Sequence, residues 1–307
     1  MQSPIYIIGT GAIGMTLAVF LQQAGREVYL LRGRAGNVPE EETLLTVDCS
    51  DGSTRSARVR TGTLAQHPLN GIVLLTSKTF GNAELAGRLR GKTGQSPMVL
   101  LQNGLGIEQP FLDAGFPALY RCVLLATSQV QAPQRVSYKP VAASPVGIVR
   151  GQENELVALV EHISTPQFAF RAEPSIEPVV WEKVITNCVF NTICPLLDVD
   201  NGIFHRDALA LSLAREVIAE CVAVAGLAHI RLDAQAVEQR LLQISQRSDG
   251  QLISTLVDIR QGRETEIDSL NLAVAQLAQR LGKPDLAIRT RLLGELVKRK
   301  ANINRAH

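Results

Sequence analysis

The chain of 307 residues has few aromatic side chains, little net charge and no long apolar run. Aromatics make up 4% of the residues and the formal net charge is +2, so a nucleic-acid-binding surface is not expected. No apolar run approaches the roughly 20 residues that a membrane-spanning helix needs. The opening residues, MQSPIYIIG, lack the basic segment and cleavage site of a secretory leader. We therefore expect a cytoplasmic protein without nucleic-acid or membrane partners.

The five cysteines and five histidines are scattered along the chain. The cysteines form no CxxC pair and have no histidine pair near them, so we expect reduced thiols that pack in a cytoplasmic protein. The histidines lie far apart in the sequence, which argues against a Ser/His/Asp triad. We therefore predict no metal site.

The first half of the chain alternates short apolar runs with amphipathic stretches. Unbroken apolar runs are typical of strands in a parallel sheet that is covered on both faces. The segment 44–60 is predicted to be an inserted hairpin that turns at Asp51-Gly52. The predicted strands of the sheet are residues 5–9, 27–31, 71–76, 97–102 and 122–127.

The second half has helical periodicity throughout. Residues 173–180 contain two prolines and are predicted to be a linker. We predict a Rossmann-type α/β domain over residues 1–174 that binds NADP, and an all-helical domain over residues 175–307 that binds substrate and carries the catalytic residues. The predicted helices span 181–197, 206–226, 233–247, 251–261, 265–281 and 284–300.

A glycine-rich segment, GTGAIG, follows the first predicted strand and precedes a helix. Gly9 permits a tight turn, Gly11 lets the backbone approach a pyrophosphate, and Gly14 lets the helix pack close to the strand. The pyrophosphate would lie at the positive end of the helix dipole. A glycine-rich turn that binds nothing is the alternative. We predict that the whole segment binds a dinucleotide, including Thr10, Ala12 and Ile13.

The residues after the second predicted strand indicate which dinucleotide binds. NAD sites usually place an acidic residue there to bind the ribose hydroxyls. This chain has Arg32 and Arg34 and no acid nearby. Guanidinium groups suit a 2′-phosphate, so we predict NADP. The alternative is that these are two solvated loop arginines.

The predicted helix 181–197 is apolar almost all round but carries one polar stripe. Lys183, Asn187 and Asn191 are four residues apart, so each lies about 40° further round the helix than the one before. A partly desolvated lysine in a cleft can donate a proton to a ketone as negative charge builds on its oxygen. Alternatively, the lysine extends to solvent and the asparagines cap neighbouring loops.

Several segments together resemble the ketopantoate reductase (2-dehydropantoate 2-reductase) family over nearly the whole chain. They are GTGAIG, SKTF, LLQNGLG, WEKVITNCVFN, DNG and STLVDIRQGRETEID. The resemblance implies a two-domain plan like that of 6-phosphogluconate dehydrogenase. It also implies NADPH-dependent reduction of 2-ketopantoate to (R)-pantoate, in the route to pantothenate and coenzyme A.

The resemblance also implies roles for individual residues. Lys183 would be the proton donor and Glu266 would assist it, because a nearby carboxylate favours the charged form of a lysine. Lys78 would lie near the nicotinamide or the substrate, and Asn103 between the nicotinamide ribose and the substrate. The substrate would be bound by Asn103, Lys183, Asn187, Asn191, Asn201 and Ser254.

At three positions the chain departs from the family. Phe80 and Gly81 replace a tryptophan and a glutamine, and Gln251 replaces an asparagine. One substrate contact and the contacts on the adenine side are therefore expected to differ from those of the family.

Other functions are compatible with the same residues. A paralogue could reduce another branched 2-keto acid, and an NADPH-binding regulatory protein could keep the fold without chemistry. A hydroxyacid or polyol-phosphate dehydrogenase would be expected to bring a basic cluster into the cleft, where the striped helix offers only Lys183. The helical half has enough apolar surface for a homodimer, but the sequence marks no interface.

Overall fold

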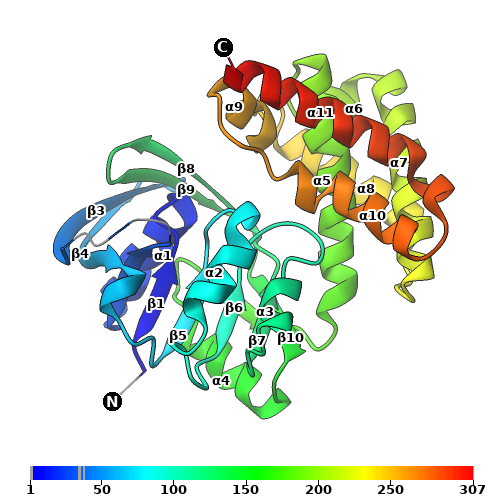
Figure 1. Ribbon diagram of the computed structural model, residues 1–307. Coiled ribbons are helices and arrows are strands. Elements are labelled where there is room, and N and C mark those ends of the chain that lie inside the picture. The colour runs from blue at the N-terminus through cyan, green and yellow to red at the C-terminus, as the bar shows by residue number, and fades with distance from the viewer. Residues whose placement is uncertain (1–2, 34–35, 37–38, 307) are drawn as a thin grey trace. The chain divides into compact units, whose positions relative to one another are not determined.

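The computed structural model describes residues 3–33, 36 and 39–306 (Figure 1), so Arg34 lies outside the described residues. The chain forms two compact units, and the sequence boundary between them lies between Ile176 and Glu177. The second unit also includes the short loop Asn103–Gly106, which comes from within the first half of the sequence. The predicted boundary lies two residues earlier, between residues 174 and 175, and the roles assigned to the two domains stay predictions.

The first unit is built on an 11-stranded sheet with the order β11-β10-β7-β6-β5-β1-β2-β4-β3-β9-β8. The strands β7, β6, β5, β1, β2 and β4 run parallel, and β1 has β2 on one side and β5 on the other. The strand order therefore reverses at β1, which is where such sheets bind ligands. The strands are β1 Ile5–Ile8, β2 Val28–Arg32, β3 Glu41–Cys49, β4 Thr54–Thr63, β5 Ile72–Leu75, β6 Met98–Leu100, β7 Leu119–Cys122, β8 Ala126–Ala132, β9 Arg135–Pro140, β10 Ser144–Arg150 and β11 Phe170–Ala172.

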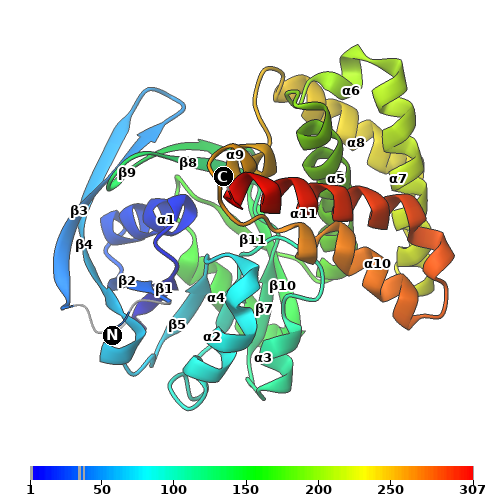
Figure 2. The same ribbon diagram turned by 45° about the horizontal axis from the view of Figure 1, so that its top comes forward.

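Helices cover both faces of this sheet. Successive side chains of a strand point to opposite faces, so Ile5 and Ile7 join the core with α1 and α4, while Tyr6 and Ile8 join the core with α2 and α3. The outer strands β3, β4, β8 and β9 curve around α1 (Figure 2). The helices are α1 Ala12–Gln23, α2 Asn82–Leu89, α3 Gln109–Asp113 and α4 Glu153–Ile163, with short 3-10 turns at Leu64–Gln66 and Thr79–Gly81 (η2).

The second unit is helical. Its longest helix, α5, buries Trp181, Val184, Ile185, Cys188 and Val189, as the apolar periodicity predicts. The α/β sheet unit followed by helices confirms the predicted fold class. The helices are α5 Ile176–Leu197, α6 Ile203–Arg206, α7 Ala208–Leu227, α8 Ala234–Arg247, α9 Ser254–Arg260, α10 Asn271–Arg280 and α11 Ile288–Ala306, with 3-10 turns η3 Ile267–Ser269 and η4 Pro284–Ala287.

Some local predictions were wrong, and the predicted hairpin was confirmed. The predicted helix 265–281 begins only at Asn271, after the separate 3-10 turn η3. The predicted strand 122–127 instead covers the end of β7 and the start of β8. The predicted linker 173–180 is helical from Ile176, because Pro178 lies in the first helical turn, where its missing N–H is not needed. Strands β3 and β4 are antiparallel and turn at Asp51-Gly52, with a φ of +85° at Gly52. Among the described residues, no helix has both the length and the apolar character needed to cross a membrane.

Candidate active site

The three glycines of the GTGAIG turn have different surroundings. Gly9 has a φ of +129°, and a Cβ there would lie 2.5 Å from the backbone nitrogen of Ser77. A Cβ on Gly14 would lie 1.9 Å from the carbonyl oxygen of Gly9. A Cβ on Gly11, in contrast, would have no heavy atom within 4 Å. Two glycines therefore allow tight packing, while the third leaves open space in front of the turn.

The open space at Gly11 lies at the N-terminus of α1. Gly11 is the N-cap residue of this 12-residue helix, which has no side-chain cap and no acidic residue in its first turn. The first N–H groups of a helix lack partners within the helix and carry partial positive charge. Thr10 and Gly11 are exposed, and Ala12 and Ile13 are half-buried. The turn therefore has the geometry of an anion site for a phosphate group.

The ends of the neighbouring strands place further predicted residues at the same edge of the sheet. The Gly9 N–H donates to the carbonyl of Leu31 (3.0 Å), so Arg32, which is exposed, follows directly beside the turn. The Thr76 hydroxyl donates to the carbonyl of Gly9 (3.0 Å). Lys78 is exposed two residues later and is the N-cap residue of η2. The structure thus brings Gly9, Arg32 and the loop of Lys78 together at the carboxyl-terminal ends of three neighbouring parallel strands.

A buried pair of side-chain amides holds two loops of this edge together. Gln102 Nε2 donates to Asn82 Oδ1 (2.7 Å), and Asn82 Nδ2 donates to Gln102 Oε1 (2.9 Å). Gln102 Nε2 also donates to the carbonyl of Ser77 (2.8 Å), and Asn82 Nδ2 to that of Ile107 (3.0 Å). Sequence reasoning did not identify this pair, although Gln102 directly precedes Asn103 in the LLQNGLG motif.

The polar stripe of α5 is only partly open. Lys183 and Asn187 are half-buried, whereas Asn191 is 4% exposed. The hydroxyl of Thr255, which is also buried, donates to Asn191 Oδ1 (2.6 Å). This bond joins α5 to α9 beside Ser254, the exposed first residue of α9. Asn191 therefore fixes the start of α9, and with it Ser254, through the side chain of Thr255. Thr255 was not among the predicted site residues.

The loops that carry Asn103 and Glu266 lie together in the second unit. The carbonyl of Glu266, a half-buried residue, accepts from the backbone N–H and the hydroxyl of Ser269 (3.0 and 2.9 Å). The carbonyl of Ser269 accepts from the N–H of Leu105 (2.7 Å). A Cβ on Gly104, whose φ is +117°, would lie 2.5 Å from Ser269 Cβ. Neither Gly104 nor Ser269 was predicted, because this contact joins segments 165 residues apart.

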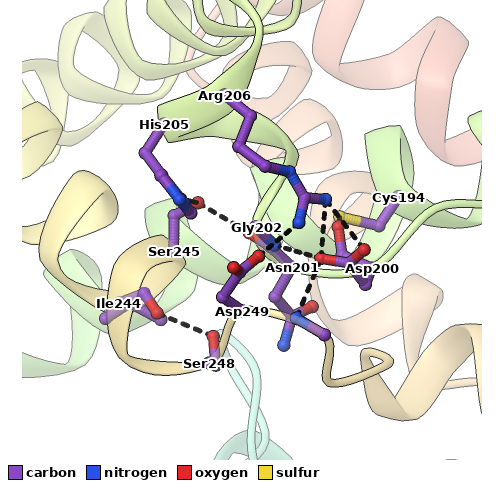
Figure 3. Close-up of polar contacts among 11 residues, drawn as sticks. Cys194, Asp200, Asn201, Gly202, His205, Arg206, Ile244, Ser245, Ser248 and Asp249 are labelled. Atoms are coloured by element: carbon purple, nitrogen blue, oxygen red, sulfur yellow. Dashed lines mark hydrogen bonds and ion pairs between the residues drawn. The ribbon is translucent and has the colours of Figure 1, made fainter.

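Asn201 has a fixed backbone and an unpartnered side-chain oxygen. Its N–H donates to the carbonyl of Gln251 (2.9 Å), and its carbonyl accepts from the hydroxyl of Ser245 (2.7 Å; Figure 3). The residue is 7% exposed, and its Oδ1 is buried with no hydrogen-bond partner among the described residues. A buried acceptor without a donor is costly, so this oxygen is suited to accept from a ligand. Gln251 takes part here through its backbone, and its side chain is exposed.

The cysteines of α5 are not candidate nucleophiles. Burial raises the pKa of the Cys194 thiol to about 12, and the nearby Asp200 adds to this effect. Burial likewise raises the pKa of Cys188 well above its usual value. Because the thiolate is the reactive form, these thiols stay protonated and inert.

Comparison with protein families gives matches in both halves of the chain. The model described as "Ketopantoate reductase PanE/ApbA" matches residues 5–146, and the model described as "Ketopantoate reductase PanE/ApbA C terminal" matches residues 175–301. The chain belongs to the ketopantoate reductase family and is an oxidoreductase of that family. The resemblance inferred from the sequence motifs is thereby confirmed.

Individual relatives agree with this assignment. The 2-dehydropantoate 2-reductase of Pyrococcus abyssi is 26% identical over 90% of this chain and 91% of its own length. The enzyme of the same name from Halobacterium salinarum is 29% identical over 96% of this chain and 97% of its own length. The structure of a D-mandelate dehydrogenase with NADH and anilino(oxo)acetate is similar in fold, with a TM-score of 0.84 at 21% identity, covering 98% of this chain and 99% of that one.

Proposed function

We propose that the protein reduces 2-ketopantoate to (R)-pantoate with NADPH, in the route to pantothenate and coenzyme A. Family membership in both halves of the chain supports a keto acid reductase, and the curated relatives carry the name 2-dehydropantoate 2-reductase. The five free cysteines support a reducing, cytoplasmic setting. A homodimer stays a prediction.

The choice of substrate rests on one observation, the unpartnered Oδ1 of Asn201. This buried oxygen can only accept a hydrogen bond, so a fitting ligand must bring a donor. The ketone and the ionised carboxylate of a simple 2-keto acid are acceptors. 2-Ketopantoate carries in addition one hydroxyl group, which can donate. We assign that hydroxyl to Asn201.

For the cofactor, the residues of the first unit fit a dinucleotide with a phosphate on the adenosine ribose. The open space at Gly11 admits the pyrophosphate to the N-terminus of α1. Arg32, exposed beside the turn, pairs with the 2′-phosphate. Lys78 and Asn103 hold the nicotinamide end. When bound, the nicotinamide supplies the hydride.

The residues of the second unit bind the keto acid and supply the proton. Lys183 donates its ammonium proton to the ketone oxygen as charge develops there. Glu266 keeps the lysine charged. Asn187 and Ser254 donate to the acceptor groups of the substrate, and Asn191, whose Oδ1 accepts from Thr255, offers its NH₂ group.

A second candidate is a reductase of another 2-keto acid, and the fold similarity to a D-mandelate dehydrogenase favours it. Benzoylformate, the keto acid that corresponds to mandelate, has no hydroxyl group and would leave the Oδ1 of Asn201 without a donor. A regulatory protein that only binds NADPH is the third candidate. It is disfavoured because it has no need of a lysine and a glutamate at the positions of Lys183 and Glu266.

A comparison of three substrates tests the proposal. NADPH oxidation is followed with 2-ketopantoate, with 2-ketoisovalerate, which lacks the hydroxymethyl group, and with benzoylformate. We expect kcat/KM for 2-ketopantoate to exceed that for 2-ketoisovalerate by about 10- to 100-fold, the range typical for loss of one buried hydrogen bond. Asn201→Ala should abolish this preference, whereas the exposed-residue control Asn302→Ala should keep it. Reduction of benzoylformate without reduction of 2-ketopantoate would favour the second candidate.

A further inference from the structure

Two loops of the second unit meet at an arginine that the sequence motifs did not mark. One loop, residues 198–202, joins α5 to α6, and the other, residues 248–253, joins α8 to α9. Arg206, the last residue of α6, forms ion pairs with Asp200 and with Asp249 (Figure 3). Its Nη2 lies 2.9 and 2.8 Å from the two carboxylate oxygens of Asp200. We call these three side chains the Arg206 clamp.

Asp200 extends the clamp to the backbone of both loops. Its Oδ1 accepts from the N–H of Gly202 (2.7 Å) in its own loop and from the N–H of Gly250 (3.2 Å) in the other. A Cβ on Gly202 would lie 1.7 Å from Asp249 Oδ1, so only glycine permits this approach. The carboxylate oriented by Arg206 therefore fixes the backbone at Gly202, directly after Asn201, and at Gly250, directly before Gln251.

Hydrogen bonds beneath the clamp fix Asn201 itself. Its N–H donates to the carbonyl of Gln251, and its carbonyl accepts from the buried hydroxyl of Ser245. Because that hydroxyl donates its only proton to Asn201, it accepts from Nδ1 of His205 (3.1 Å), which must carry a proton. Because both backbone groups of Asn201 are fixed, the direction of its side chain depends on how the two loops are positioned relative to each other.

We propose that Arg206 is a positioning residue, which keeps Asn201 and the segment leading to Ser254 in the positions that bind the keto acid. The proposal rests on the proposed function, because Asn201 and Ser254 bind substrate only if that function holds. Arg206 is assigned no contact with substrate or cofactor and acts through Asp200 and Asp249. Its substitution should therefore weaken substrate binding and leave cofactor binding unchanged.

The chain offers a matched control for the alternative that the clamp is merely a surface ion pair. Arg215 Nη2 lies 2.7 Å from Glu238 Oε1, and this pair joins α7 to α8 in the same unit. Its side chain is 57% exposed, compared with 42% for Arg206, and the carboxylate partners Glu238 and Asp200 are 23% and 24% exposed. The two pairs differ mainly in that only the Arg206 clamp holds loops with predicted substrate residues.

The experiment compares Arg206→Ala, Arg206→Lys and Arg215→Ala with the wild type in two measurements. In steady-state kinetics, Arg206→Ala should raise KM for 2-ketopantoate about tenfold, with kcat and the KM for NADPH within about twofold. Arg206→Lys should recover part of the loss, because it restores the charge but not the fork of donors. Arg215→Ala should leave all three parameters unchanged.

The second measurement is amide hydrogen exchange of the full chain, read on peptides covering residues 199–203 and 249–254. Arg206→Ala should speed exchange there about tenfold relative to wild type, and Arg215→Ala should not. Unchanged exchange in Arg206→Ala would overturn the clamp. Faster exchange with an unchanged KM would overturn the positioning role. If the wild type reduces no 2-keto acid, the proposed function fails, and exchange alone then decides whether Arg206 holds the two loops.

Discussion

In the first unit, two loops are joined by the buried neutral amides of Asn82 and Gln102, whereas in the second unit two loops are joined by the charges of the Arg206 clamp. Each arrangement lies next to predicted site residues in the sequence: Gln102 precedes Asn103, and Asp200 precedes Asn201. The amide pair is 4% and 5% exposed, while the arginine side chain of the clamp is 42% exposed.

Because the two arrangements differ in burial, we expect them to contribute differently to the free energy of unfolding. Removing one partner of a buried polar pair leaves the other without a hydrogen bond and costs about 1–3 kcal/mol. An exposed ion pair contributes about 0–1 kcal/mol and is weakened by salt. The strand ends predicted to bind the cofactor are therefore fixed as part of the folded core. The loops predicted to bind the substrate are fixed by contacts that contribute to geometry more than to stability.

Among the changes that test this comparison of the two units, the largest expected effect comes from the glycine turn of the first unit. Gly14→Ala should lower the free energy of unfolding by about 3 kcal/mol, because the added Cβ meets the carbonyl of Gly9 at 1.9 Å. Gly11→Ala should change stability by less than about 1 kcal/mol, yet weaken NADPH binding about tenfold or more by filling the open space. Denaturant unfolding and NADPH titration measure both. Equal stability of the two variants would contradict the packing assigned to Gly14.

The next largest effect is expected from reversing the charge of Arg32, which tests the predicted preference for NADPH. Arg32→Asp should reverse the preference for NADPH over NADH, with a loss of NADPH affinity of about 10- to 100-fold, because a carboxylate repels the 2′-phosphate and accepts from ribose hydroxyls. Arg58→Asp makes the same charge change on β4, four positions before Gly62, which pairs with Leu31 of β2, and should leave the preference unchanged. NADPH affinity that survives Arg32→Asp would show that the phosphate lies elsewhere.

A direct contrast of the two loop connections gives a smaller effect. Asn82→Leu should lower the free energy of unfolding by about 2 kcal/mol, because the buried Oε1 of Gln102 loses its donor. Arg206→Ala should lower it by less than about 1 kcal/mol. Denaturant unfolding of both variants at low and high salt tests the contrast. A larger loss of stability for Arg206→Ala than for Asn82→Leu would contradict the greater contribution assigned to the buried amide pair.

The smallest effect concerns pH. The hydrogen bonds from Arg206 hold the pKa of Asp200 below its usual 3.8, even though partial burial acts in the opposite direction. A carboxylate with a depressed folded-state pKa contributes its full stability above its unfolded-state pKa and loses it as the pH falls through the folded value. The ratio of KM between Arg206→Ala and wild type should therefore stay constant from about pH 5 to 8. A ratio that falls toward one within this range would show that Asp200 is not the group that Arg206 holds.

The sequence predicted the elements whose pattern is local. The apolar period of α5, the GTGAIG turn and the hairpin at Asp51-Gly52 each follow from spacing within a short segment. Strands β8 and β9 were missed because they are rich in exposed polar residues and lack the apolar runs of the central strands. The start of α5 was misplaced because Pro178 was taken as a breaker, although the first turn tolerates it.

The site was predictable by residue type but not by contact. Family resemblance indicates Lys183, Asn201 and Glu266, but it says nothing of how their loops are held. The contacts Thr255–Asn191 and Arg206–Asp249 join residues 64 and 43 positions apart, and no period or motif in either segment marks its partner. Such pairings depend on the packing of the helices, which a single sequence does not disclose.

The most direct test of the account is the turnover of 2-ketopantoate by Lys183→Ala, with Lys298→Ala, whose lysine pairs with Asp268 at the surface, as control. If Lys183 donates the proton, kcat should fall by about two to four orders of magnitude, while NADPH affinity stays within about twofold and the control matches the wild type. A Lys183→Ala variant that keeps kcat within about threefold of the wild type would contradict the assignment of Lys183 as the proton donor.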